Sequence, residues 1–169
     1  MLNQQNSDYD ADDGSDLLLV KLTPEAISRT WPDLRAALEV VLPPISNPTQ
    51  GPDRMTNILE ALLTERLICY CIYKRIDGTV YVFGIVIVSI MKNVESEQRN
   101  LLIYALYAHP KYVSGDYAEK FILKMKEVAK NYDCKALVAY TSIPNLISHF
   151  VRLGGDASYR LLTMEVDNG

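Results

Sequence analysis

The chain has 169 residues, 49% hydrophobic and 22% charged, so it is long enough to fold as one domain without a disulfide or a metal. Five of its 21 acidic residues and none of its 17 basic residues lie in residues 1–16, so the rest of the chain is close to neutral. Because it has no run of basic residues, the sequence does not predict nucleic-acid binding.

The three cysteines, Cys69, Cys71 and Cys134, do not form a recognisable framework. An odd count without CxxC spacing argues against a disulfide-stabilised fold and against a zinc site. Cys69 and Cys71 stand two apart in a strand-like run, so their side chains point the same way. We predict that the cysteines are small buried hydrophobic residues in a reducing compartment, and we expect no metal.

The N-terminus is acidic and polar, which is unlike a signal peptide. The longest apolar run, residues 80–91, is too short to cross a bilayer as a helix and is rich in β-branched residues. We therefore expect a cytoplasmic protein that is neither secreted nor membrane-bound. Residues 1–16 are predicted to be a disordered acidic polar tail, and residues 17–169 a single folded domain.

The first third of the domain is predicted to be mainly helical. Residues 17–22 form a short apolar strand, and Thr23-Pro24 is typical of an N-cap followed by the first helical residue. This helix is expected to break near Trp31-Pro32 and to resume over residues 33–42. A proline-rich loop over residues 43–53 then leads to a second helix over residues 56–66.

The middle of the chain predicts an antiparallel meander. Asp77-Gly78 is a typical hairpin turn, and residues 93–100 form a charged loop. The strands that these connections join are predicted at residues 67–74, 80–91 and 101–108.

The last third predicts a β-α-β unit followed by a short helix and a strand. Asp116 and Glu119 form a capping-box pattern before the most periodic helix of the chain. A helical crossover makes the next strand, residues 136–140, parallel to residues 101–108. A helix over residues 144–153 then ends at Gly154-Gly155, and residues 157–166 form a last strand. The predicted fold is α+β: a mixed central sheet, antiparallel and then β-α-β, flanked by helices.

The turn at residues 110–118 joins a strand to a helix N-terminus, where free N–H groups favour an anion. This order of elements resembles the GNAT N-acetyltransferase superfamily over nearly all of residues 17–167. The likeness is strongest from Tyr107-Ala108-His109-Pro110 through Leu153-Gly154. It implies acetyl-CoA as a possible cofactor, with the pyrophosphate held by the turn.

The turn departs from the family pattern Arg/Gln-x-x-Gly-x-Gly/Ala. Val113 takes the Arg/Gln position and Asp116 the first Gly position, while Ala118 matches and Gly115 is one residue off. With a carboxylate at residue 116 about 4 Å from a phosphate, the repulsion energy would be on the order of a few kcal/mol. Alternatively, Asp116 is only a helix cap. The residues that the resemblance places at the cofactor are Leu106, Ala108, Val113, Ser114, Gly115, Asp116, Ala118 and Asn145.

The catalytic residues stay unassigned. Where the family often has a general-acid Tyr, this chain has Phe150, and His149 points about 100° away on a helix. The candidates for a general base are Tyr104, Tyr107 and Glu97, although tyrosines on strands usually serve packing. Asn145 follows Pro144 and is equally consistent with the start of the helix.

The chain also resembles a GNAT-like family of virion and assembly proteins of short-tailed bacteriophages, in its size and in residues 148–154 followed by 159–166. That resemblance implies a non-catalytic structural or assembly component packaged in a virion. Its partner would be a portal, tail or internal virion protein, bound through the acidic tail. The alternative is an active acetyl-CoA-dependent N-acetyltransferase, which would need only backbone N–H contacts from residues 114–118 and a proton relay through solvent or His149.

Overall fold

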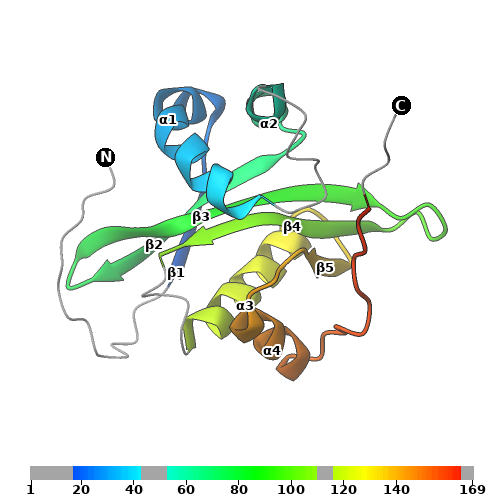
Figure 1. Cartoon of the computed structure of the whole chain (residues 1–169). Helices are drawn as coiled ribbons and strands as arrows, with labels where there is room; N and C mark the ends of the chain where they lie inside the picture. The colour runs from blue at the N-terminus through cyan, green and yellow to red at the C-terminus, as the bar shows by residue number, and fades with distance from the viewer. Residues whose placement is uncertain (1–16, 43–52, 110–115, 165–169) are drawn as a thin grey trace.

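The computed structural model describes residues 17–42, 53–109 and 116–164. In this part of the chain, five strands form one sheet in the order β1-β2-β3-β4-β5. Neighbours are antiparallel from β1 to β4, and β5 is parallel to β4. Helices α1 and α2 lie on one face of the sheet, and α3 and α4 lie on the other (Figure 1). The predicted mixed sheet flanked by helices is confirmed.

The elements follow the predicted order up to α4. They are β1 Leu17–Lys21, α1 Pro24–Val41, α2 Asp53–Leu63, β2 Ile68–Ile76, β3 Thr79–Lys92, β4 Arg99–Ala108, α3 Asp116–Asn131, β5 Ala136–Ala139 and α4 Pro144–Arg152.

Helix α1 begins as predicted but does not break. The Thr23 hydroxyl accepts a hydrogen bond from the Ala26 N–H at 3.2 Å, and Pro24 is the first helical residue. The predicted interruption near Trp31-Pro32 is wrong, because α1 continues through Pro32. Apolar side chains on both sides of Pro32, such as Ile27 and Leu34, are buried on one face. Their packing outweighs the hydrogen bond that the proline removes.

Two local features shape the meander. Asp77 and Gly78 both have positive φ (48° and 79°), which is the two-residue type I′ turn that the Asp-Gly pair predicts. The β3–β4 register shifts between Ile87 and Val88: Ile87 pairs with Ala105 and Val88 with Ile103. Tyr104 is therefore the extra residue of a β-bulge.

The bulge resets which side chains of β4 face which layer. Before it, Leu101 and Ile103 belong to the core under α3 and α4; after it, Leu106 packs on that core. Tyr104, Ala105 and Tyr107 belong to the core under α1 and α2.

Helix α3 buries the apolar face that its periodicity predicts, with Met125 fully buried. The Tyr70 hydroxyl on β2 donates to the Tyr132 hydroxyl, just after α3, at 3.1 Å. The three cysteines are free; Cys69 and Cys134 are buried and Cys71 is half-buried, which agrees with the prediction that they are packing residues.

Helix α4 ends in the predicted glycine cap. Gly154 has φ 92°, its N–H donates to Val151 O at 3.0 Å, and the Gly155 N–H donates to Phe150 O at 2.8 Å. These two bonds are a Schellman motif.

The prediction of a last strand is wrong for the residues that the structure describes. Residues 157–164 form no strand and are exposed; residues 165 and 166 lie outside the described part. A strand needs a neighbour to hydrogen-bond with, and none of the described strands pairs with this segment.

Candidate functional site

Strands β4 and β5 separate near the middle of β4. Their parallel pairing runs from Asn100 with Ala136 to Ile103 with Ala139. Beyond it, β4 continues to Ala108, while the chain after β5 leads to α4. In the described part of the chain, no strand covers this edge of β4 after Ile103.

Two residues of β4 direct their backbone groups to this open edge. The His109 N–H donates to Phe83 O at 3.1 Å, so odd-numbered residues here bond to β3. Leu106 and Ala108 alternate with these residues, so their backbone N–H and C=O groups point away from β3, towards the open edge. The open edge therefore offers backbone donors and acceptors to a ligand with amide groups.

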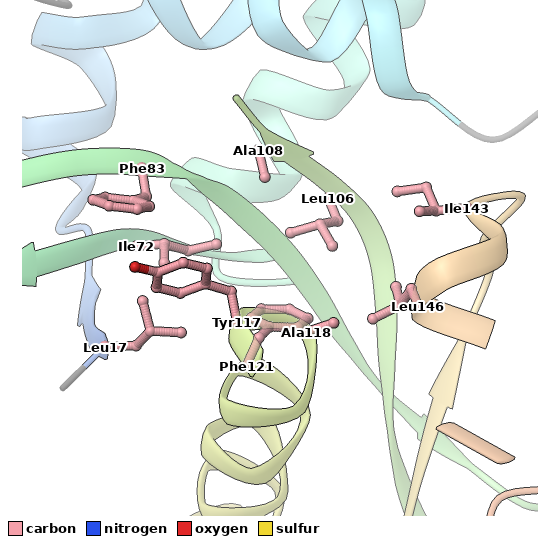
Figure 2. Close-up of a pocket in the computed structure, with 10 residues that line it drawn as sticks. All are labelled: Leu17, Ile72, Phe83, Leu106, Ala108, Tyr117, Ala118, Phe121, Ile143 and Leu146. Carbon is pink, nitrogen blue, oxygen red and sulfur yellow. The ribbon is translucent and has the colours of Figure 1, made fainter. Parts of the chain in front are cut away.

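A cavity of about 50 Å³ lies beneath this edge. Figure 2 shows side chains of the sheet above it, α3 below it and α4 beside it. Volume on this scale holds a group of a few atoms rather than a whole cofactor. The lining residues are Leu17, Ile72, Phe83, Leu106, Ala108, Tyr117, Ala118, Phe121, Ile143 and Leu146.

The structure brings three of the predicted cofactor-binding residues together in this wall: Leu106, Ala108 and Ala118. Asn145 is half-buried in the first turn of α4, next to the lining residue Leu146.

The remaining cofactor-binding predictions cannot be placed. Val113, Ser114 and Gly115 lie outside the described residues. Asp116 begins α3, but its side chain lies outside the description, so its role as a cap or as a repulsive charge stays a prediction.

A buried cation lies behind the cavity wall. Lys74 is 3% exposed, and its Nζ donates to the Tyr117 hydroxyl and lies 4.6 Å from the centre of that ring. The Tyr117 ring in turn packs 5.9 Å from the Phe83 ring. In Figure 2 the Tyr117 hydroxyl points to the Ile72 side of the cavity, away from Ile143.

Sequence reasoning missed Lys74 and Tyr117, although a signal was present. Strand alternation places Lys74 on the same face as Ile68, Tyr70 and Ile72, which are all buried. A lysine at an apolar position of a strand predicts a buried charge with a specific partner.

The helix α4 candidates do not supply an acid to the cavity. Phe150 packs against the core under α3 and α4 and carries no proton to give. His149 Nδ1 lies 2.9 Å from the Arg152 guanidinium, which also forms an ion pair with Glu119 of α3. These contacts hold α4 against α3 and leave His149 in a surface cluster.

The general-base candidates also lie elsewhere. Tyr104 and Tyr107 pack in the core under α1 and α2, on the other face of the sheet from the cavity. Glu97 lies in the β3–β4 turn, at the opposite end of β4 from Ala108, and forms an ion pair with Lys92 at 3.3 Å. Among the lining residues, only Tyr117 carries a group that exchanges a proton.

The described ranges, residues 17–42, 53–109 and 116–164, show neither a metal cluster nor a membrane-spanning helix. No three His, Cys, Asp or Glu side chains there are grouped so that they would hold a metal ion. No helix there combines the length and apolar character that a membrane crossing requires.

Comparison with known proteins shows similarity at the level of structure only. No protein-family model and no curated protein matches the sequence. Solved structures do match. An acetyltransferase of Trypanosoma brucei superposes with a TM-score of 0.58 at 15% identity, over 89% of this chain and 100% of that one. A GNAT family acetyltransferase of Staphylococcus aureus gives 0.60 at 13% identity, over 89% and 99%. The fold is that of the GNAT acetyltransferases.

A third match was solved with a cofactor. An aminoglycoside N-acetyltransferase, AAC(6')-Iy, in complex with CoA, gives a TM-score of 0.57 at 19% identity, over 92% of this chain and 98% of that one. The superpositions show that this chain has the GNAT fold, whereas identities this low carry over no chemistry from the matched proteins.

Proposed function

We propose that this GNAT-fold protein does not catalyse acyl transfer and acts as a structural or assembly component that binds another protein. The observation that supports this is the cavity wall, in which nine of ten residues are apolar. The hydroxyl of the tenth, Tyr117, accepts a hydrogen bond from Lys74. Transfer from a thioester to an amine requires one proton to leave the amine and one to reach the thiolate. Phe150 supplies neither step.

The kind of assembly is proposed from the sequence. The resemblance of residues 148–154 and 159–166 to a GNAT-like family of short-tailed bacteriophages supports a virion-associated role. The five acidic residues in residues 1–16 support a tail that binds a partner through its charge. To test this, the full chain and a variant with these five aspartates changed to asparagine are compared as baits for virion proteins. Capture that is equal for both baits contradicts the role of the tail.

The second candidate function is an acetyl-CoA-dependent N-acetyltransferase. The open edge of β4 favours it, because the amide-bearing arm of acyl-CoA could pair with the backbone of Leu106 and Ala108, with its acyl group in the cavity. The first turn of α3, which contributes Ala118 to the same wall, would then lie near the phosphates. Holding the two reactants together would supply much of the rate even without an acid.

Thermal unfolding with acetyl-CoA separates the two candidates. A ligand stabilises only the state that it binds, so millimolar acetyl-CoA should leave the melting temperature unchanged if the site is not used. A rise of several degrees would instead support the second candidate.

In that case Ser114→Glu should abolish the rise, since it adds a negative charge where the phosphates would lie. Ser158→Glu is the matched control, because Ser158 is exposed in the segment after α4. Loss of the rise in both variants would show a general charge effect.

A further inference from the structure

Strand β4 is left without a neighbour on one side over the second half of its length. Its pairing with β5 ends at Ile103, whose carbonyl accepts a last hydrogen bond from the Tyr140 N–H at 3.3 Å. Beyond that point, the backbone groups of Leu106 and Ala108 face the open edge and have no partner in the described part of the chain. An unpaired strand edge is a template for another extended chain, because its N–H and C=O groups need partners.

The space under this edge is apolar. Leu106 and Ala108 line the cavity from the sheet, Ala118 lines it from α3, and Ile143 and Leu146 line it from the start of α4 (Figure 2). In two neighbouring strands, residues that lie directly opposite each other direct their side chains to the same face of the sheet. A strand added beside Leu106 and Ala108 would therefore direct alternate side chains to the face on which the cavity lies.

The size of the cavity matches one aliphatic side chain. About 10–15 Å³ of such volume holds one water-sized group, so the cavity of about 50 Å³ holds roughly three to five. Valine, isoleucine and leucine side chains have three or four carbon atoms. Because nine of the ten residues in the wall are apolar, the cavity would bury such a side chain without leaving a polar group unpaired.

The start of α3 favours an occupant without phosphate groups. Asp116 is the first residue of this helix, and the sequence predicts that its carboxylate opposes phosphate binding. An extended peptide offers the amide groups that the edge accepts and the apolar side chain that the cavity accepts, and it brings no phosphate.

We propose that the open edge of β4 binds an extended peptide segment of a partner protein, with its backbone paired to Leu106 and Ala108 and one valine, isoleucine or leucine side chain in the cavity. Main-chain hydrogen bonds give such a complex its affinity, and the cavity selects the side chain. This inference rests on the proposed function, because it names the kind of segment that a non-catalytic binding protein would take.

The first test uses a random library of short peptides, selected against the immobilised full chain. We expect the enriched peptides to share one valine, isoleucine or leucine. Replacing that residue by alanine in a synthetic peptide should weaken its binding by roughly tenfold to a hundredfold. A library that yields no binding peptide overturns the proposal, and so do enriched peptides that share no apolar residue.

Two variants of the protein test where the side chain is bound. Ala118→Leu adds three carbon atoms to the cavity wall, so it should fill the cavity and weaken peptide binding by about tenfold or more. Ala136→Leu is the matched control, because Ala136 is exposed at the start of β5, and it should bind the peptide as the parent does. Urea unfolding checks that both variants fold. A folded Ala118→Leu variant with the affinity of the parent overturns the proposal.

Hydrogen exchange, followed residue by residue, tests the backbone pairing on the unaltered chain. The N–H groups of Leu106 and Ala108 should exchange roughly tenfold or more slowly when the peptide is bound. The N–H groups of Tyr107 and His109 point to β3 and should change far less. Peptide binding that leaves exchange at Leu106 and Ala108 unchanged overturns the proposal.

These results also separate this site from the proposed function. A selected peptide that binds elsewhere on the protein contradicts the site and leaves the assembly role standing. Slower exchange at Leu106 and Ala108 with millimolar acetyl-CoA, and with no selected peptide, contradicts both, because acyl-CoA would then be the occupant.

Discussion

The backbone of β4 lies close against Gly84 of β3, and replacing this glycine with alanine should be costly. Gly84 on β3 pairs with Ala108 on β4. A Cβ added to Gly84 would lie 3.0 Å from Ala108 Cα and 3.1 Å from the Tyr107 carbonyl carbon, and well inside the radius of the Tyr107 oxygen. These are backbone atoms, so β4 itself would have to move.

The size of the effect follows from that movement. Carbon atoms pack at about 3.5–4.0 Å, so β4 must retreat by roughly 0.5–1 Å. The nearby hydrogen bond from the His109 N–H to Phe83 O, now 3.1 Å, would then be lost. Overpacking costs about 1–3 kcal/mol and a lost hydrogen bond about 1 kcal/mol, so we expect Gly84→Ala to lower the free energy of unfolding by about 2–4 kcal/mol.

Urea unfolding measures this change, with Gly78→Ala as the control. Gly78 has φ 79° and nothing within 4 Å of an added Cβ, so alanine there costs only the left-handed conformation, about 1–2 kcal/mol. If Gly84→Ala costs no more than Gly78→Ala, the strands are not in close contact and the reasoning fails. The same retreat would move Ala108, so Gly84→Ala should also alter the cavity wall.

Three other predictions concern side chains. Tyr117→Phe leaves the Lys74 ammonium without its hydroxyl acceptor, and should lower the free energy of unfolding by about 1–3 kcal/mol in urea; no loss would mean that the contact is unimportant. Burial, with a smaller effect of the neighbouring thiol, raises the pKa of Cys69 from 9.0 to about 12. The unfolded chain then releases this proton above pH 9 and the folded chain does not. The free energy of unfolding should therefore fall as the pH rises from 9 towards 12, by at most about 1.4 kcal/mol per pH unit. In the Cys69→Ala variant it should fall less steeply, as measured by urea unfolding at a series of pH values. The Arg152–Glu119 ion pair is partly exposed (58% and 35%), so a double-mutant cycle to alanine should give a coupling energy of only about 0–1 kcal/mol; a larger value would show a more rigid junction of α3 and α4.

Most of the fold could be predicted because local patterns and packing agree. The Asp77-Gly78 turn, the Thr23 cap and the apolar face of α3 each depend on neighbours in sequence. The interruption at Pro32 was predicted from local chemistry alone, and burial on both sides of the proline overrides it. The strand at residues 157–166 was predicted from composition, which cannot say whether a partner edge is within reach.

The site could be predicted only where it follows from the order of elements. Leu106, Ala108 and Ala118 stand at the ends of a strand and a helix that are consecutive in sequence. Leu17 and Phe83 reach the same cavity from strands whose place in the sheet depends on the whole topology. No local pattern contains that information.

Helix α3 is fastened to one strand at both of its ends. Tyr117 at its start contacts Lys74, and Tyr132 just after its end contacts Tyr70, and both partners lie on β2. Inserting one residue into the helix would rotate everything after it by about 100° and move it by about 1.5 Å, so at most one of the two contacts could survive. The length of α3 is thus fixed by a distance on the sheet, and related sequences should tolerate substitutions in this helix far better than changes in its length.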